Sequence, residues 1–365
     1  MTRNLFQKYY HKDLQRVYRK FYGVILDNII GDIPDLQTYF EDMGRFLTPQ
    51  ARVLISYHNP SWEPTLTLAS KLGLRKKVGV QNWLDQEDLK NILNLSGFEV
   101  ISSQKRFFGI TTVTIARILN TKYQIPNTKY SVSIIIPARN EEGNVAEIIP
   151  SIPKFGKWQE IIFVEGNSTD HTWSAITKVV KRTRPSQRLQ RVKAFRQKLE
   201  GKADAVRLGL SKATGDILMI YDADRTVDTK ELQKFYNALA TGVGEFANGS
   251  RLVYPMEGQA MQTLNKIGNQ MFSSLFTWIL GQRFKDTLCG TKAFFRKDYL
   301  KFKPSKTDPF GDFDLIFGAI RNNLKVIEIP VRYKERVYGS TNISRFYHGL
   351  LLAKMAFLAF VEFRT

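Results

Sequence analysis

The sequence predicts an α/β protein whose larger part is a doubly wound, mostly parallel sheet, preceded by a shorter α/β segment. Short apolar runs without polar alternation, which are typical of strands covered on both faces, recur along the chain, and segments with helical spacing separate them. Several of these runs stop at charged or turn-forming residues. Because α/β proteins bind ligands at the carboxyl ends of parallel strands, these residues are the first candidates for a functional site.

The composition indicates a globular protein with anionic partners. The 365-residue chain is long enough for two domains, and 43% of its residues are hydrophobic. A formal net charge of +20 favours nucleotide phosphates, an anionic membrane surface or nucleic acid as partners. The basic run from Lys181 to Lys202 carries no nucleic-acid-binding signature, so we predict no nucleic-acid partner.

Cysteine usage and hydropathy bear on location. Cys289 is the only cysteine, which excludes an intramolecular disulfide and a thiolate zinc site and favours a cytoplasmic location. Met1–Lys20 lacks the apolar core of a signal peptide, and the longest apolar candidate for a membrane span, Gly349–Val361, contains Lys354. We therefore expect a cytoplasmic protein, attached peripherally to the membrane if at all. Its oligomeric state, a homo-oligomer included, stays open.

Residues 1–120 are expected to alternate strands and helices before a polar linker at 121–130. The apolar patterns predict strands at Gly23–Ile30, Arg52–Tyr57, Phe98–Ser102 and Thr111–Ile118, and helices at Asp32–Leu47 and Gln86–Leu95.

Three motifs, Val24–Asp27, Ile33–Leu36 and Phe46–Pro49, make this segment similar to the second half of a class I S-adenosylmethionine-dependent methyltransferase. The resemblance implies a cofactor on a glycine-rich turn after the first strand, and nothing before Gly23 offers such a turn. We therefore predict a truncated half-domain that does not bind the cofactor. Either its catalytic half has been lost or the true start lies upstream.

Residues 131–345 are predicted to form the main sheet, because strand and helix patterns alternate with short turns. The expected strands are Ser131–Ile136, Glu160–Val164, Gln190–Ala194 and Ile217–Tyr221, and the expected helices are Asn144–Ile152, Trp173–Val180 with Thr169 or Asp170 as N-cap, and Gly201–Lys212.

Two carboxylates, Asp222 and Asp224, follow the last of these strands directly. In an extended segment, side chains two residues apart point the same way. Paired carboxylates suit Mg²⁺ or Mn²⁺, which keep open positions for substrate phosphates. Alone, such a pair is no more than an acidic turn.

Other predicted strands end in similar chemistry. Arg139 and Glu141 follow the first strand, and Glu165 follows the second. Lys202 begins a helix whose amino terminus favours a phosphate. Together these turns are suited to a ribose, a diphosphate and a divalent ion.

Residues 131–345 resemble the family-two inverting glycosyltransferases, and among them the polyprenyl-phosphate sugar synthases such as dolichyl-phosphate mannosyltransferase. The matching motifs are Pro137–Glu141, Glu165–Asp170, Gly201–Ala203, Asp222–Asp224, Asn248–Arg251, Asp286–Lys292 and Pro330–Tyr333. The resemblance implies a nucleotide-diphosphosugar transferase fold of the GT-A type, a nucleotide-sugar donor, a divalent metal and inversion at the anomeric carbon.

The resemblance also implies a role for each matching position. The donor is expected to contact Pro137, Arg139, Glu141, Glu165, Lys202 and Asp222. The metal is expected on Asp222, Asp224 and Thr226, where Thr226 replaces the Gln of many relatives. The acceptor or donor phosphates are expected on Arg251, Lys266 and Arg336. Relatives continue with Gly-x-Ser-Lys, whereas this chain has Gly339–Asn342 and lacks that lysine.

The reaction implied is an in-line displacement in which the metal and cations stabilise the leaving diphosphate, with Asp224 and Asp286 as catalytic candidates. A phosphate acceptor needs no general base, whereas a hydroxyl acceptor needs a carboxylate, for which Asp286 is the candidate. Asp286 as a helix cap or as the partner of Lys292 is an equally good interpretation.

Two apolar segments with helical spacing, Gln262–Leu280 and Phe346–Phe363, suit an enzyme at a membrane interface, with 346–365 as a C-terminal amphipathic helix. Ordinary core or dimer packing is the alternative.

Three functions follow: hexose transfer to polyprenyl phosphate, transfer to a sugar hydroxyl, and a catalytically silent membrane or assembly protein. A nucleotidyltransferase is disfavoured, because the first turn carries carboxylates where a triphosphate would lie.

Overall fold

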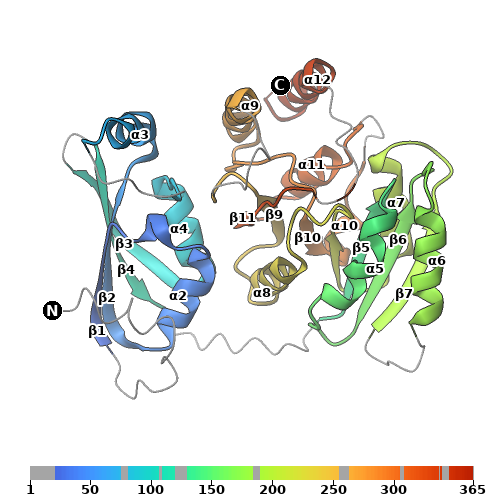
Figure 1. Ribbon diagram of the computed structural model, residues 1–365, viewed down its shortest axis with the longest axis horizontal. Coiled ribbons are helices and arrows are strands. Elements are labelled where there is room, and N and C mark those ends of the chain that lie inside the picture. The colour runs from blue at the N-terminus through green and yellow to red at the C-terminus, as the bar shows by residue number, and fades with distance from the viewer. Residues whose placement is uncertain are drawn as a thin grey trace. The chain divides into compact units, whose positions relative to one another are not determined.

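The computed structural model describes residues 21–74, 81–106, 109–119, 130–183, 190–254, 263–304, 308–336, 338 and 345–364 (Figure 1). The chain divides into two compact units. The first comprises Met1–Gln124 with Val253–Pro255, and the second comprises Ile125–Leu252 with Met256–Thr365. The predicted linker at 121–130 lies outside the described residues, apart from Tyr130.

The first unit contains a four-stranded sheet in the order β1-β2-β4-β3. Its strands are β1 (Phe21–Asp27), β2 (Leu47–His58), β3 (Phe98–Arg106) and β4 (Thr111–Ile118). β1 and β2 are parallel, and β4 runs antiparallel to both β2 and β3. The helices are η2 (Ile30–Asp32), α2 (Leu36–Gly44), η3 (Pro60–Trp62), α3 (Glu63–Lys71) and α4 (Gln86–Leu95).

The predicted bounds of α4 and β4 are confirmed. The predicted helix at Asp32–Leu47 begins later, at Leu36, because the Asp35 side chain accepts a hydrogen bond from the Thr38 backbone N–H and caps the helix there. The α3 helix was not predicted: it buries no residue, so it has no apolar stripe to reveal it.

The second unit contains a seven-stranded sheet in the order β11-β9-β10-β8-β5-β6-β7. Its strands are β5 (Val132–Ala138), β6 (Gln159–Glu165), β7 (Gln190–Arg196), β8 (Ile217–Ile220), β9 (Phe246–Ser250), β10 (Lys292–Phe295) and β11 (Val326–Pro330). Only β10 among them runs antiparallel to its neighbours, β8 and β9, so the prediction of a mostly parallel sheet is confirmed. All seven residues of β6 are buried, as expected of a strand covered on both faces.

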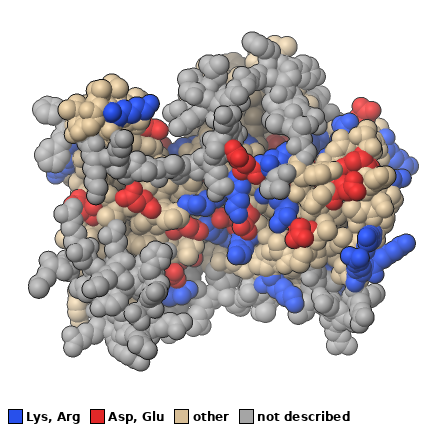
Figure 2. Space-filling view, viewed as in Figure 1, with Lys and Arg blue, Asp and Glu red and all other residues tan. Residues whose placement is uncertain are grey.

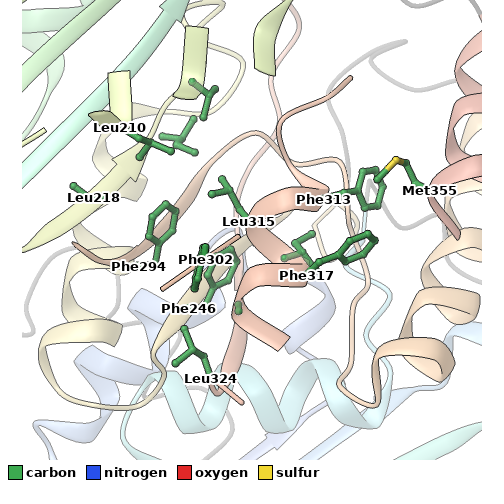
Figure 3. Packing of buried hydrophobic residues seen from close by; sticks show 14 of the residues in the cluster. Leu210, Leu218, Phe246, Phe294, Phe302, Phe313, Leu315, Phe317, Leu324 and Met355 are labelled. Atoms are coloured by element: carbon green, nitrogen blue, oxygen red, sulfur yellow. The ribbon is translucent and has the colours of Figure 1, made fainter. Parts of the chain in front are cut away.

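Helices pack around this sheet. They are α5 (Glu142–Ser151), α6 (Thr172–Arg182), α7 (Lys202–Lys212), η4 (Thr229–Glu231), α8 (Leu232–Ala240), α9 (Thr263–Leu280), α10 (Arg296–Tyr299), α11 (Phe313–Arg321) and α12 (Arg345–Arg364). Figure 3 shows the aromatic cluster that joins the strands to α11 and to Met355 of α12. Within it the rings of Phe246 and Phe294 stack with centroids 5.4 Å apart.

Two local details depart from the predictions. His171, rather than Thr169 or Asp170, occupies the N-cap of α6, and the Asp170 carboxylate instead accepts a hydrogen bond from the Thr172 backbone N–H. β8 ends at Ile220, one residue earlier than predicted. Across the described ranges, no helix is both long enough and apolar enough to cross a bilayer.

Candidate active site

The two carboxylates that follow β8 each meet a cation from another part of the chain. As predicted, both follow the carboxyl end of β8: Asp222 lies in the irregular segment after Ile220, and Asp224 lies in the turn that comes next. Asp222 Oδ1 lies 2.7 Å from Lys202 Nζ, and Asp224 Oδ2 lies 2.7 Å from Arg336 Nη2. The residue after Asp224, Arg225, has a left-handed φ of 57°, which turns the backbone sharply here.

Lys202 and Asp222 form a half-buried ion pair. Lys202 is the first residue of α7, and Gly201 before it has φ +88°, a conformation that suits glycine. Although burial alone would raise the pKa of Asp222, the charge of Lys202 holds that pKa below its usual value. A Cβ on Gly290 would come within 2.0 Å of the Asp222 carboxylate, so a side chain at position 290 would have to displace the carboxylate or the Lys202 ammonium.

Glu141 extends this arrangement. Its side chain is buried, with Oε1 3.7 Å from Arg336 Nη1 and Oε2 accepting a 2.6 Å hydrogen bond from the Asn144 amide. Burial raises the pKa of Glu141 to about 7, and the charges of Asp224 and Asp222 add to the effect. The Arg336 guanidinium therefore bridges carboxylates from two different turns.

Asp286 and Arg251 form a buried bidentate ion pair. Arg251 Nε donates to Asp286 Oδ2 at 2.7 Å and Nη2 donates to Oδ1 at 2.8 Å. Asp286 has no exposed surface, and although burial would raise its pKa, the Arg251 charge lowers it. The guanidinium also lies over the Tyr333 ring, 5.3 Å from its centroid. Asp286 thus holds Arg251 in place; a role as general base stays a prediction.

A fourth ion pair, between Lys292 and Asp312, was not predicted. Lys292 is fully buried, and its Nζ lies 2.7 Å from Asp312 Oδ1 at the start of α11. The suggested pairing of Lys292 with Asp286 is therefore wrong, since each has another partner. Three acidic residues between 308 and 314, near the start of the apolar α11, were the available signal for Asp312.

The ends of β5 and β6 hold the remaining predicted donor residues. Glu165 is buried; its Oε1 accepts a 2.6 Å hydrogen bond from the Ser168 backbone N–H, and its Oε2 lies 3.4 Å from Arg196 Nε. Glu165 therefore organises the turn after β6. Pro137 lies within β5, and Arg139 directly follows it with an exposed side chain.

The side chain of Lys266, a predicted phosphate contact in the first turn of α9, lies outside the described residues. The segment Gly339–Asn342, where the lysine of relatives is missing, also lies outside them. Thr226 is described, and its hydroxyl donates a 2.8 Å hydrogen bond to Asp224 Oδ1. This contact orients the Asp224 carboxylate.

The donor atoms fit a hard divalent cation in part. Asp222 and Asp224 offer carboxylate oxygens, which Mg²⁺ and Mn²⁺ prefer, and two protein ligands leave positions for substrate phosphates. Within the described ranges, no group of three or more His, Cys, Asp or Glu side chains is arranged around a metal position. A metal here would complete its coordination with substrate oxygens and water. Figure 2 shows acidic and basic side chains side by side in the middle of the face it views.

Comparison with known proteins shows what this part of the chain resembles. Residues 133–302, which run from β5 to β10 and carry most of the site, match the model of glycosyl transferase family 2. This match and the relatives below show that the chain is a glycosyltransferase.

Relatives of this glycosyltransferase agree with the assignment. It is 27% identical to glycosyltransferase AglJ of Haloferax volcanii over 61% of this chain and 69% of that protein. It is 29% identical to dolichyl-phosphate beta-glucosyltransferase of Saccharomyces cerevisiae over 56% of this chain and 67% of that protein. A solved structure of glucosyl-3-phosphoglycerate synthase from Mycobacterium tuberculosis aligns with a TM-score of 0.46 and 17% identity, covering 65% of this chain and 82% of that one. The family match lies outside residues 1–120, so their methyltransferase-like character stays a prediction.

Proposed function

We propose that this glycosyltransferase moves a hexose from a nucleotide-diphosphosugar to polyprenyl phosphate, with inversion and with a divalent metal, at the cytoplasmic face of a membrane. The observation that carries the proposal is the gathering of ion pairs after β8 and β9, where cations from α7 and from the segment after β11 meet Asp222 and Asp224. Relatives named as dolichyl-phosphate glucosyl- and hexosyltransferases support the lipid-phosphate acceptor.

The donor would lie along the ends of β5, β6 and β8. Arg139, beside Pro137 and Glu141, and the turn organised by Glu165 are positioned for the nucleoside. Lys202, at the amino terminus of α7, faces the diphosphate with the helix dipole behind it. Asp222 and Asp224, with Thr226 beside them, would hold Mg²⁺ or Mn²⁺, and a bound metal supplies positive charge to the departing diphosphate.

The acceptor side favours a phosphate over a hydroxyl. An acceptor phosphate is already anionic, so it attacks the anomeric carbon without a general base. Arg251, held by Asp286, and Lys266 are the cations we assign to it. Because Asp286 is fully buried and both of its oxygens bind Arg251, it is poorly placed to take a proton from a hydroxyl.

The two long helices of the second unit support membrane attachment. Leu350 and Phe357 of α12 are 72% and 67% exposed, and Trp278 of α9 is 56% exposed. Trp278 stacks on Phe360 with centroids 6.0 Å apart, and the Arg364 guanidinium lies 5.4 Å from the Trp278 ring. Exposed aromatic and aliphatic side chains next to cations suit an anionic bilayer surface.

We also propose that residues 1–120 form a methyltransferase-like half-domain that does not bind S-adenosylmethionine. The parallel pair β1 and β2, formed by the segments that carry the motifs, supports this assignment. Calorimetric titration should give no binding heat for S-adenosylmethionine, and measurable binding would contradict the proposal.

Transfer is tested by incubating the purified protein with vesicles that contain polyprenyl phosphate, Mg²⁺ or Mn²⁺, and a panel of radiolabelled nucleotide sugars. We expect label from one donor class to enter the organic phase, and chelation of the metal to abolish the product. Transfer of label to a water-soluble sugar instead would favour a hydroxyl acceptor. If no donor gives a product, with or without a lipid acceptor, the proposed transfer is contradicted.

A further inference from the structure

Arg336 occupies a cation position between two acidic turns. Its Nη2 lies 2.7 Å from Asp224 Oδ2, and its Nη1 lies 3.7 Å from Glu141 Oε1. The Arg336 side chain is 29% exposed, whereas those of Asp224 and Glu141 are only 12% and 8% exposed. Because water screens this ion pair only partly, its electrostatic interaction is stronger than that of a surface pair.

The backbone around Arg336 holds it there. Tyr333 forms a β-bridge with Val227, and the Lys334 backbone N–H donates a 2.8 Å hydrogen bond to the Thr226 carbonyl. The Lys334 ammonium lies 3.1 Å from Asp228 Oδ2. We call residues 331–336 and 338 the strap; its first part lies along the turn that carries Asp224.

The far end of the strap touches α5. The Tyr338 ring packs against Gly143, where an added Cβ would come within 2.7 Å of the ring. The strap is therefore fixed on both sides of Arg336, by the turn after β8 and by the first turn of α5. Arg336 is presented to Asp224 by this backbone geometry.

We propose that Arg336 is a counter-cation that pairs with Asp224 when no ligand is bound and competes there with the divalent metal. When the donor binds, its diphosphate pairs with Arg336 instead and Arg336 leaves Asp224. The proposal rests on the proposed function and specifies the regulation of the same site. A guanidinium and a divalent cation cannot both lie against one carboxylate without strong repulsion. A diphosphate offers Arg336 a bidentate anionic partner, so donor binding frees Asp224 for the metal.

Metal and donor binding are then coupled, and the coupling must be reciprocal. The donor-free protein binds metal weakly because Arg336 must first leave Asp224. The metal-free protein binds a nucleoside diphosphate weakly because Asp224 repels it once Arg336 has moved. Each ligand raises the affinity for the other, so the two bind together.

The test measures Mn²⁺ affinity of the full-length protein by calorimetry, with and without a nucleoside diphosphate, UDP and GDP being tried in turn. In the unchanged protein we expect the nucleotide to tighten Mn²⁺ binding about 5- to 100-fold. Arg336→Gln should tighten Mn²⁺ binding several-fold in the absence of nucleotide and remove most of this coupling. The matched control is Lys230→Gln, which removes one exposed positive charge near Asp228 and should change neither quantity.

A second variant perturbs the strap without changing charge. Gly143→Ala places a methyl group against the Tyr338 ring and should displace the strap. We therefore expect Mn²⁺ to bind this variant more tightly than the unchanged protein in the absence of nucleotide, by a smaller factor than in Arg336→Gln. Unchanged or weaker nucleotide-free Mn²⁺ binding in Arg336→Gln would overturn the counter-cation proposal and leave the proposed function standing. No binding of metal or nucleotide to the unchanged, folded protein would overturn both.

Discussion

The parallel strands of the two units both end in polar residues, but these residues find different kinds of partner. At the ends of β1 and β2, the Ser56 hydroxyl donates to Asp27 at 2.6 Å, and the Asn28 amide lies 3.1 Å from His58 Nε2. These contacts are hydrogen bonds between side chains of neighbouring segments in the same sheet. In the second unit, Asp222 and Asp224, which follow β8, pair with cations from distant segments. Asp286, which precedes β10, pairs with Arg251 after β9.

The difference shows what distinguishes a site from ordinary strand-end chemistry. Strand ends in α/β proteins are commonly polar, because the chain leaves the core there and needs hydrogen-bonding side chains to turn. Ordering buried charges from several elements costs desolvation free energy, which local turn formation does not require. The family match begins at residue 133 and so leaves out the sheet of the first unit.

The largest expected effect is on catalysis. Asp224→Asn removes one of the two metal carboxylates, so we expect sugar transfer to fall at least about 10²- to 10³-fold. The matched change in the first unit, Asp27→Asn, should leave the rate unchanged. The initial rate of sugar transfer is measured for both variants at saturating donor and metal. An equal loss of rate in both variants would contradict the difference proposed between the two units.

The buried and exposed ion pairs should differ in stability. Asp286→Asn leaves the Arg251 guanidinium without its buried counter-charge, and the expected cost is about 3–5 kcal/mol. Glu99→Gln breaks the exposed pair with Arg117 in the first unit and should cost about 0–1 kcal/mol. Denaturant unfolding followed separately for the two units measures both values. A cost below 1 kcal/mol for Asp286→Asn would contradict the structural role of that pair.

Two glycines sharpen the comparison at the level of packing. Gly290→Ala would place a methyl group 2.0 Å from Asp222 Oδ2 and 2.5 Å from Lys202 Nζ, forcing the pair apart. We expect nucleotide affinity to fall by about tenfold or more, a change of about 1.4 kcal/mol. Gly23→Ala, whose Cβ would make only ordinary contact with the Arg52 carbonyl, should be neutral. Calorimetric titration of nucleotide and metal gives the answer.

The last expected effect is a pH dependence of stability. Burial raises the pKa of Glu328 to about 7, although its carboxylate accepts backbone hydrogen bonds from Lys285 and Asp286. A pKa that is raised in the folded state means that the native protein favours protonated Glu328. The contribution of Glu328 to the free energy of unfolding is therefore full below its unfolded-state pKa of about 4.3, and it is lost as the pH rises to about 7. Glu328→Gln should therefore gain Tm relative to the unchanged protein between pH 5 and pH 8. A Tm difference independent of pH would contradict this.

The sequence predicted the elements of the second unit better than their contacts. The uninterrupted apolar runs of β5 and β6 placed both strands within two residues of their bounds, because burial on both faces leaves an unambiguous pattern. The candidates Lys202 and Asp222 were found separately at chain turns. Their pairing required the amino terminus of α7 to lie next to the segment that follows β8, which no local pattern indicates.

Long-range pairs account for most of what the sequence did not reveal. Lys292 and Asp312 lie twenty residues apart in the sequence. Lys292 is the first residue of β10 and Asp312 is the N-cap of α11, so their pairing depends on how the fold brings these two element starts together. The positions of Asp222 and Asp224 after β8 were predicted, but not that each pairs with a different cation, Lys202 or Arg336, from a distant part of the chain. Chain direction beyond a strand end depends on turn geometry, such as the positive φ of Arg225, which sequence alone did not indicate.

The central claim is that the edge of the second sheet binds a nucleotide-diphosphosugar together with a divalent metal. Thermal unfolding with a panel of nucleotide sugars, each with and without Mn²⁺, measures this most directly, since a ligand that binds only the native state raises Tm. We predict that at least one donor raises Tm in the presence of Mn²⁺ and that Asp224→Asn abolishes the rise. If the protein is folded and no nucleotide sugar changes its Tm, with or without metal, the account is contradicted.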